Sequence, residues 1–349
     1  MKTLLKTKLF FYRLFSKTFG KNILKALDFG VQVNLGNGKK QKNHPFLVVI
    51  TVDSESGYVD KNERRIWQRE NPSAFVGYYK GIRNITKIFD KHNIKATFFL
   101  STNCFSSKGK YYSRIKQELN SVAKKGHEIG LHLHPDSDMA IQKKLSIKFN
   151  ATSAFFYDYK EKLKIIKAAR ELIKQHLGNK TAKKLISFRW GNWALDSDGA
   201  KVLSKAGFKI DSSATPGIKG HAKDTMKYDW SKVKTHYPWK LNLNNYQSTS
   251  DSSDITEIPI ATFGFFGLKL RADPVNSALL NKAFVEYYKN ANRSNKPFPF
   301  VVMTHSSEAT YSDGKPTITL KDLEGFISFA KRYANVKFVT LQEANNKLN

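Results

Sequence analysis

Residues 45–53 read PFLVVITVD, and this short stretch indicates the fold. A continuous apolar run that ends in an acidic residue is typical of a β-strand buried on both faces, as in a parallel sheet. Similar runs recur along the chain. We expect further strands at 94–102, 185–191, 208–213, 255–264, 298–308 and 336–344, with the last running into a short helix.

Segments of helical spacing separate the expected strands. They lie at about 77–92, 111–125, 155–177, 196–207, 275–293 and 319–333. This alternation predicts an α/β fold with a mostly parallel sheet and helices outside it, either open or closed into a barrel. Residues 217–254 are irregular and polar, which indicates an insertion or a long loop. We find no internal repeat, dinucleotide-binding fingerprint or phosphate-binding glycine loop in the sequence.

The composition is that of a globular protein with an unusual charge balance. Among 349 residues, 59 are Lys or Arg and 29 are Asp or Glu, which gives a formal net charge of +30. Such a surface favours anionic partners. The lysines are spread along the whole chain, whereas a nucleic-acid-binding protein concentrates them on one face, so we expect no nucleic-acid partner. The single cysteine, Cys104, excludes an internal disulfide and a cysteine-based zinc site.

The N-terminal region differs in character from the rest of the chain. We expect residues 1–43 to form a basic amphipathic segment with a linker, followed by a catalytic domain at 44–349. Residues 1–26 could lie on an anionic membrane surface or pack on the protein's own core. The apolar runs are too short for a signal peptide or a transmembrane helix. We therefore expect a cytoplasmic protein, with peripheral contact to the inner membrane as one alternative.

Polar residues gather where the predicted strands end. Asp53 and Glu55 follow the first apolar run, and His132 and His134 lie in GLHLHPD at the end of another. Residues i and i+2 of a strand point to the same side, so each pair shares a face. The carboxyl ends of strands in a parallel barrel meet at one face, where active sites lie. Imidazole and carboxylate groups together suit zinc or a similar divalent metal.

Two further strand ends add Arg189, in FRWG, and His305, in VVMTHSSE. A carboxylate near a metal can take a proton from water, and a histidine on another strand can donate one to a leaving group. The convergence of these residues from four strands predicts metal-assisted hydrolysis of an amide or ester. Taken singly, Asp53 and Glu55 could be helix caps or ion-pair members. The aromatic surroundings of Arg189 favour a buried, partnered role.

The stretch GHEIGLHLHPD (126–136) holds three histidines that differ in position. His127 precedes the strand, and its odd position points it away from the other two. We expect a structural role for it.

The order of these motifs resembles that of the polysaccharide deacetylases, carbohydrate esterase family 4, over about residues 45–345. TVDSE resembles the first family motif, GHEIGLHLHPD the second, SFRWG the third and VVMTHSSE the last. The resemblance implies a distorted (β/α) barrel with about seven parallel strands and helices outside.

The resemblance also implies roles for individual residues. Asp53 would be the catalytic base, Arg189 would hold that base, and His305 would be the general acid. Glu55 and His132 would be ligands of a divalent metal, with Zn²⁺ as the first choice.

The sequence departs from the common family pattern at the second histidine. That residue usually comes four positions after the first, where this chain has Asp136. His134 comes two positions after the first instead, as in divergent branches with His-x-His-Pro, so we expect His134 to be the ligand and keep Asp136 as the alternative. Glu55 stands where many members have Asp. These departures indicate a substrate other than chitin or bulk peptidoglycan.

The leading hypothesis is a metal-dependent hydrolase that removes an N-acetyl or O-acetyl group from a sugar in cell envelope polysaccharide biosynthesis. The substrate would be a carbohydrate, which could be lipid-linked. One alternative is a deformylase or another hydrolase of non-peptide carbon–nitrogen bonds that acts on a lipid-linked sugar. Another is an inactive relative that binds glycans.

Overall fold

The computed structural model describes residues 44–67, 72–222, 225–250, 253–291 and 296–348. The predicted segment 1–43, with its membrane contact through residues 1–26, lies outside the described residues. Within the described ranges, no helix is both long enough and apolar enough to cross a bilayer.

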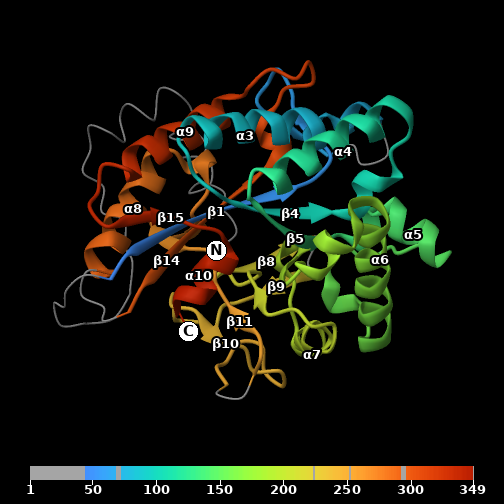
Figure 1. Cartoon of the computed structure of the whole chain (residues 1–349). Helices are drawn as coiled ribbons and strands as arrows, with labels where there is room; N and C mark the ends of the chain where they lie inside the picture. The colour runs from blue at the N-terminus through green and yellow to red at the C-terminus, as the bar shows by residue number, and fades with distance from the viewer. Residues whose placement is uncertain (1–43, 68–71, 223–224, 251–252, 292–295, 349) are drawn as a thin grey trace.

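A nine-stranded sheet forms the centre of the molecule, and every strand except β10 runs parallel to its neighbour (Figure 1). The short strand β15 (Val336–Phe338) pairs with the first half of β1. The other strands follow one another in the order β10 (Trp239–Lys240), β11 (Thr256–Glu257), β7 (Ile210–Asp211), β6 (Ser187–Trp190), β5 (Glu128–Leu133), β4 (Thr97–Ser101), β1 (Phe46–Ser54) and β14 (Phe298–His305).

The segment 258–261 closes the gap between the two ends of this sheet. The backbone N–H of Ile258 donates to the carbonyl of Asp211 beside β7, at 2.8 Å, and that of Ala261 donates to the carbonyl of Val301 in β14, at 3.0 Å. The sheet therefore curls into a distorted barrel, which confirms the predicted fold class.

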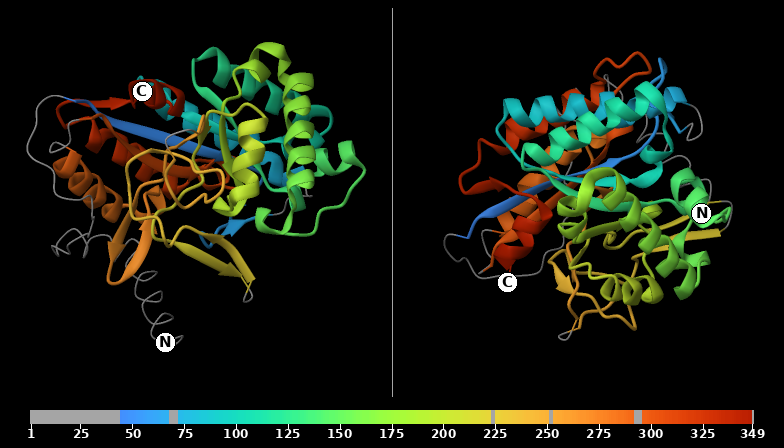
Figure 2. Two further views of the ribbon diagram at one scale, coloured as in Figure 1. Left: turned by 90° about the horizontal axis from the view of Figure 1, so that it is seen from below. Right: turned by 45° about the vertical axis from the view of Figure 1, so that its right-hand side comes forward.

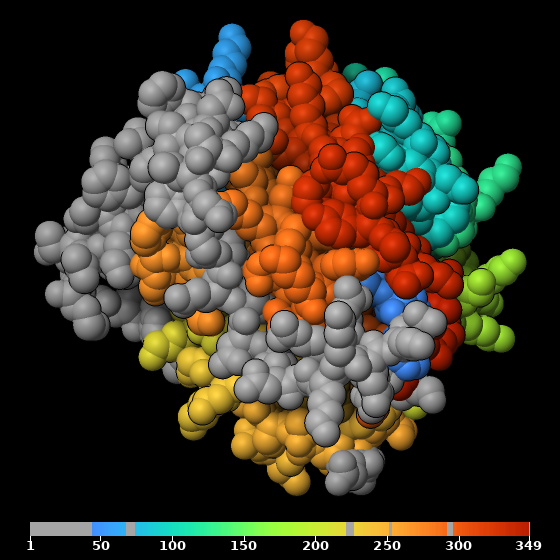
Figure 3. All heavy atoms as spheres, turned by 90° about the vertical axis from the view of Figure 1, so that its left-hand side faces the viewer, coloured from blue at the N-terminus to red at the C-terminus, as the bar shows by residue number. Residues whose placement is uncertain are grey.

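Helices cover the outside of the barrel. In Figure 1, α3 and α4 lie along one side of β1 and β4, and Figure 2 shows the same layer from two other directions. The helices are α3 (Ile82–Lys91), α4 (Gly109–Lys124), α5 (Met139–Leu145), α6 (Tyr159–Lys183), α7 (Ser197–Lys205), α8 (Ala278–Ala291), α9 (Ile318–Ala330) and α10 (Leu341–Leu348). Helices α8 and α9 pack side by side at the surface seen in Figure 3.

The period of two in β1 divides its side chains between two cores. Val48, Ile50 and Val52 belong to the large core under the outer helices. Leu47 and Val49 point into the barrel, where they pack with Phe99, Val301 and other apolar side chains. Thr51 and Asp53 continue this inner row toward the carboxyl end of the strand. The interior is thus apolar at one end and polar at the other.

Helix α10 closes the apolar end of the barrel. Leu341 and Ala344 belong to the inner core. At its amino end, the backbone N–H of Leu341 donates to the hydroxyl of Thr97, and that of Gln342 donates to the carboxylate of Glu128. The polar end of the barrel is therefore where we expect the functional site.

The structure differs from the sequence-based boundaries in several segments. The expected strand 255–264 is divided into β11 and β12 (Thr262–Phe265), because the intervening residues bridge to β14. The expected strand 336–344 ends at Phe338, since α10 already begins at Leu341. The irregular region 217–254 contains a hairpin of β8 (Lys219–Ala222) and β9 (Thr225–Asp229), as well as β10.

His127 lies outside the barrel, in the core beneath α3. Its Nδ1 accepts a hydrogen bond from the backbone N–H of Ala96, at 3.2 Å, and its ring packs against Phe89 and Phe98. Burial, with a smaller effect from Lys95, lowers the pKa of His127 to about 4. Protonation would therefore disfavour the folded state.

Replacing His127 by glutamine should make the protein less sensitive to acid. The folded pKa of about 4 lies below the reference value of 6.5, so the unfolded chain binds the proton first as the pH falls. His127 makes its full contribution to the free energy of unfolding above pH 6.5, and this contribution is lost as the pH falls toward about 4. Between about pH 7.5 and about pH 5, wild type should lose about 1–2 kcal/mol more than H127Q in urea unfolding. Equal losses would contradict this account.

Candidate active site

The polar end of the barrel is organised by an ion pair between β6 and β1. Arg189 Nη1 lies 2.7 Å from Asp53 Oδ1, and both side chains are almost completely buried. Arg189 also donates to the hydroxyl of Thr51 and to the backbone and side-chain oxygens of Ser212. Its guanidinium centre lies 4.4 Å from the ring centroid of Phe99. These contacts fix the guanidinium in one orientation.

This ion pair keeps Asp53 ionised. Burial alone would raise the pKa of the Asp53 carboxyl, but the charge of Arg189, with smaller effects from His132 and His305, lowers it below its ordinary value. A carboxylate that stays charged inside a protein is able to accept a proton from a reacting group.

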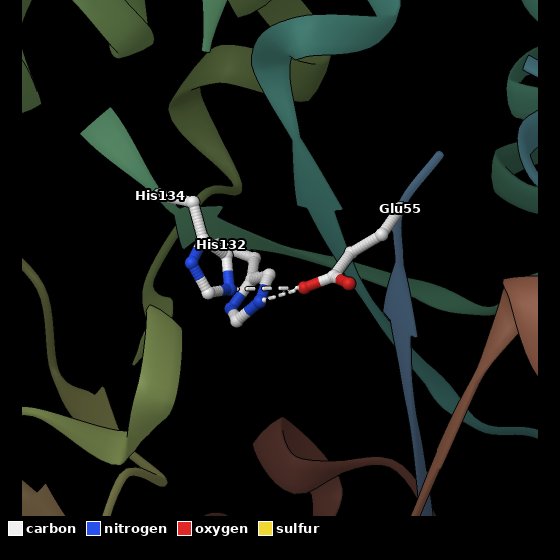
Figure 4. Close-up of side chains that lie close together, drawn as sticks. All are labelled: Glu55, His132 and His134. Atoms are coloured by element: carbon white, nitrogen blue, oxygen red, sulfur yellow. Dashed lines mark hydrogen bonds and ion pairs between the residues drawn. The ribbon is translucent and has the colours of Figure 1, made fainter. Parts of the chain in front are cut away.

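Glu55, His132 and His134 come together beside this pair. Figure 4 shows both imidazole rings pointing toward the Glu55 carboxylate. Glu55 Oε1 lies 2.7 Å from His132 Nε2 and 3.1 Å from His134 Nε2. One potential ligand atom from each residue lies within 4.8 Å of the others, and all three residues are buried. The sequence pattern predicted that His132 and His134 share a face, and the structure brings both of them to Glu55.

The surroundings of His132 prepare its Nε2 for a cation. Its Nδ1 lies 3.0 Å from the carbonyl oxygen of Arg189, and because a carbonyl only accepts, Nδ1 carries the proton. Nε2 then faces the Glu55 carboxylate. Burial lowers the pKa of His132, but the charges of Asp53 and Glu55 outweigh this effect and raise it overall.

The same environment acts on Glu55 in the opposite direction. Burial raises the pKa of its carboxyl, but the hydrogen bonds from His132 and His134 bring it well below the ordinary value. The pocket therefore holds a carboxylate and attracts positive charge to the space between three ligand atoms. Two imidazoles and one carboxylate are a ligand set that zinc and related divalent metals accept, so the residues present fit a metal ion.

Gly191 makes room for His134. A Cβ at Gly191 would lie 2.5 Å from Cε1 and Nδ1 of the His134 ring and 2.5 Å from the carbonyl oxygen of Leu133. The glycine of the FRWG stretch is thus explained by the close approach of the histidine on the neighbouring strand. The two motifs are parts of one site.

Asp136 lies in a different place. It belongs to the short 3₁₀-helix η4 (Pro135–Ser137), half-buried, and it is in neither of the clusters of potential metal ligands found among the described residues. The geometry therefore favours His134 over Asp136 as the partner of His132. The ligand assignment itself stays a prediction.

His305 lies across from the ion pair, at the end of β14. Its Nε2 is 3.9 Å from Asp53 Oδ2, and its Nδ1 is 3.1 Å from Glu308 Oε2. Burial raises the pKa of Glu308, but the charges of His305 and Arg65 bring it down to about 2. Asp273 lies nearby, and burial together with the Glu308 charge raises its pKa to about 7.

Asp273, His305 and Glu308 form a second cluster with the spacing of metal ligands. Glu308 Oε1, however, already has a cation, because Arg65 Nη1 lies 3.0 Å away. Arg65 Nη2 lies 3.0 Å from Glu55 Oε2, so this arginine connects the two clusters. We interpret Asp273 and Glu308 as residues that position the His305 ring, not as metal ligands.

Sequence reasoning did not find Arg65, Asp273 or Glu308. Glu308 follows His305 by three residues, as in a capping box, and this spacing is visible in THSSE. Arg65 lies on the β2 (Tyr58–Val59) and β3 (Arg65–Ile66) hairpin. Asp273 caps a short 3₁₀-helix. The sequence around Arg65 and around Asp273 contains no pattern that connects either residue to the site.

Comparisons with known proteins found a family match and a shared fold. Residues 76–210 match the model of the polysaccharide deacetylase family, which is the family that the sequence motifs resemble. The matched part contains His132, His134 and Arg189, whereas Asp53 and His305 lie outside it. The predicted class of enzyme, a hydrolase of carbon–nitrogen bonds other than peptide bonds, is confirmed.

Solved structures share the fold at low sequence identity. A putative polysaccharide deacetylase from Mycobacterium smegmatis aligns with a TM-score of 0.58 and 16% identity over 91% of this chain and 95% of that one. A probable polysaccharide deacetylase from Pseudomonas aeruginosa PAO1 gives 0.55 and 12%, over 88% and 94%. A putative glycoside hydrolase/deacetylase from Parabacteroides distasonis gives 0.61 and 12%, over 89% and 72%. A search of curated proteins found no match.

A double-mutant cycle tests the central ion pair. Replacing Arg189 by methionine leaves the Asp53 charge buried without its cation, and replacing Asp53 by asparagine leaves the guanidinium without its anion. Each change should lower the free energy of unfolding by about 3–5 kcal/mol. The double variant should lose clearly less than the sum, since it buries neither charge. Urea unfolding of the four proteins measures this, and additive losses would contradict the pairing.

Proposed function

We propose that this chain is a metal-dependent hydrolase that removes an acetyl group, N-linked or O-linked, from a sugar in surface polysaccharide metabolism. The supporting observation is the meeting of three elements at one end of the barrel. The first is the buried, ionised carboxylate of Asp53, and the second is His305, whose Nε2 lies 3.9 Å from it. The third is the adjacent group of Glu55, His132 and His134.

The metal would be a divalent ion of the zinc type, held by Glu55, His132 and His134. Such an ion lowers the pKa of water toward neutrality and polarises the acyl oxygen. The remaining chemistry belongs to side chains of the protein.

Asp53 acts as the general base in this proposal. Its carboxylate takes a proton from the attacking water, and Arg189 keeps it ionised and aimed into the site. Because Arg189 also presents its carbonyl to His132, a single residue orients the base and one ligand.

His305 acts as the general acid. The ionised Glu308 carboxylate lies 3.1 Å from Nδ1 of the ring as an ion-pair partner, and Nε2 faces Asp53 and the reacting group. As the carbon–nitrogen or carbon–oxygen bond of the acyl group breaks, Nε2–H passes to the departing nitrogen or oxygen. Acetate and the free amine or alcohol are the products.

The family and the net charge support the choice of substrate. The matched family is that of polysaccharide deacetylases, which supports an acylated carbohydrate. A net charge of +30 favours a substrate displayed on an anionic surface, as a lipid-linked sugar would be. The lipid linkage, the role in the cell envelope, the cytoplasmic location and the membrane contact of residues 1–26 stay predictions.

Formyl is the acyl group that competes with acetyl in this proposal. The small pocket beside Glu55 and His134 is lined by polar side chains, such as Ser101 and Asn103, and by the aromatic rings of Trp67 and Tyr78. A formyl group is smaller than an acetyl group by one methyl, so it also suits a small pocket, and deformylation is the competing reaction. Analysis of the released acid distinguishes the two.

The mechanism predicts which variants lose activity. Zinc-loaded protein incubated with N-acetylated oligosaccharides should release acetate, and Asp53→Asn or His132→Ala should lower kcat/KM by at least about 100-fold, because each removes a group that the reaction requires. Asp90→Asn is the matched control. It removes an exposed carboxylate that pairs with Lys125 on the outer surface, and its activity should equal that of wild type.

Acetate release that survives in either site variant would overturn the mechanism. Release of formate from N-formylated sugars, without release of acetate, would replace the proposed reaction by the competing one.

The choice between His134 and Asp136 is tested by metal affinity. In calorimetric titration of the metal-free protein with zinc, His134→Ala should bind more than about 100-fold more weakly, because a ligand is lost. Asp136→Asn should stay within about threefold of wild type. The opposite order would assign Asp136 as the ligand.

A further inference from the structure

Helix α5 is fixed beside the candidate site. The Asp138 carboxylate caps its first turn. The backbone N–H of Met139 donates to Asn103 Oδ1, at 3.1 Å, and Asn103 lines the same small pocket as Glu55 and His134. A surface on α5 therefore has a constant position relative to the place where substrate would react.

Helix α5 buries one side and presents the other to solvent. Ala140 and Ile141 belong to the large core. Met139 is 40% exposed at the first position of the helix, and Lys143, one turn later, is exposed on the same side. Figure 1 shows α5 at the edge of the molecule, beyond the arrowhead of β4 and beside α6. The outward side of the helix thus combines an apolar side chain with a charged one.

The turn after α5 carries a second exposed apolar side chain. Ser146 has a left-handed φ of 54°, and the backbone N–H of Ile147 donates to the carbonyl of Gln142, at 3.1 Å, which ends the helix in a closed turn. Ile147 is 41% exposed, and Lys144 and Lys148 near it are exposed as well. The turn thus repeats the combination found on the helix.

A third exposed apolar side chain follows on the 3₁₀-helix η5 (Ala154–Phe156), where Phe156 is 53% exposed. The neighbouring Tyr157 packs its ring against Phe149, at a centroid distance of 5.4 Å, and its hydroxyl donates to the carbonyl of Ala151, at 2.6 Å. These contacts hold the loop that carries Phe156 against the segment that follows α5.

Single exposed apolar residues are common and need no explanation, but this segment differs from such cases in two respects. It contains three of the seven large apolar side chains that are exposed among the described residues. It also has no Asp or Glu from position 139 to position 157, whereas it has lysines at 143, 144 and 148. Exposed apolar side chains interspersed with lysines are typical of surfaces that lie on an anionic bilayer.

We propose that this segment forms a surface that docks on an anionic lipid bilayer. The α5 surface consists of Met139, Lys143, Lys144, Ile147, Lys148 and Phe156. Its apolar side chains would enter the interfacial layer, and its lysines would pair with the lipid headgroups.

The apolar side chains favour a bilayer over a soluble polyanion. A polyanion would neutralise the lysines but would leave Met139 and Ile147 in water, whereas a bilayer accommodates both kinds of side chain. The inference rests on the proposed function only for its consequence, which is that a lipid-linked sugar would meet the site at the membrane surface. The docking itself does not depend on the reaction.

A fluorescent label tests whether the α5 surface touches lipid in the full chain. Asn150→Cys places an exposed thiol near Ile147 and leaves the α5 surface intact, and the natural Cys104 is buried, so an environment-sensitive dye reacts with the new thiol. With vesicles of equal parts phosphatidylcholine and phosphatidylglycerol, the emission should shift to shorter wavelength. The shift should become smaller at about 1 M salt, where charges are screened beyond about 3 Å.

A label at the other end of the barrel is the control for this shift. Lys337→Cys places the dye on β15, at an exposed position near the apolar end. Its emission should not change with the same vesicles.

Reversal of the lysine charges measures their contribution to binding. The triple variant Lys143→Glu, Lys144→Glu, Lys148→Glu should lower the vesicle partition coefficient at least about 30-fold in a sedimentation assay, because each lysine near an anionic surface contributes to the attraction. Met139→Ser combined with Ile147→Ser should lower the partition coefficient about 10-fold, since two apolar side chains are lost from the interface.

A matched variant has the same change in net charge at the apolar end of the barrel. It carries Lys124→Glu in the last turn of α4, Lys337→Glu in β15 and Lys347→Glu in the last turn of α10, all at exposed positions. Its partition coefficient should stay within about threefold of wild type. Urea unfolding of all variants checks that the fold is intact.

Vesicle binding that shifts the label at position 150, and that the α5 variants weaken more than the matched variant, supports the proposal. Binding without that shift, as when residues 1–26 alone make the contact, overturns it. Equal weakening by both triple variants, no vesicle binding, or binding of heparin in place of vesicles also overturns it. All of these results stand whether or not acetate is released, so failure of the proposed reaction would be seen separately.

Discussion

The buried pair of Arg189 and Asp53 is the interaction on which the site depends. A guanidinium inside a barrel is costly unless each donor has a partner, and here Thr51, Ser212 and Asp53 supply them. The pair keeps the carboxylate charged, and the backbone carbonyl of Arg189 orients the ring of His132. The charge state of the proposed base, Asp53, and the orientation of the proposed metal ligand His132 therefore both depend on Arg189.

Two clusters of charged groups lie on either side of this pair, and Arg65 connects them. One contains Glu55 and the two histidines that follow one another along β5 and its end, and the other contains His305 with its carboxylates. One guanidinium nitrogen of Arg65 pairs with Glu55 and another pairs with Glu308. Each ion pair restricts the rotation of the carboxylate. In the proposed mechanism, this arrangement separates the metal site from the proton donor, and both lie at the same end of the barrel.

The sequence predicted those parts of the fold and site that depend on local periodicity. The alternation of strands and helices predicted the barrel. The period of two predicted that His132 and His134 share a face, and in the structure both approach Glu55. Parallel strands place their carboxyl ends together, so Asp53, Arg189 and His305 could be grouped from their positions in the sequence alone. The remaining parts depend on long-range packing that no local pattern records. Arg65 reaches the site because a hairpin folds back over the end of β1, and Asp273 reaches it because the segment after β13 (Leu268–Arg271) packs beside β14.

The most direct test of the central claim is anomalous diffraction from crystals soaked in zinc, recorded at the zinc absorption edge. The account predicts one strong peak within bonding distance of His132 Nε2, His134 and the Glu55 carboxylate. A peak bound by Asp136, a peak between Asp273, His305 and Glu308, or the absence of any peak at His132 would contradict it.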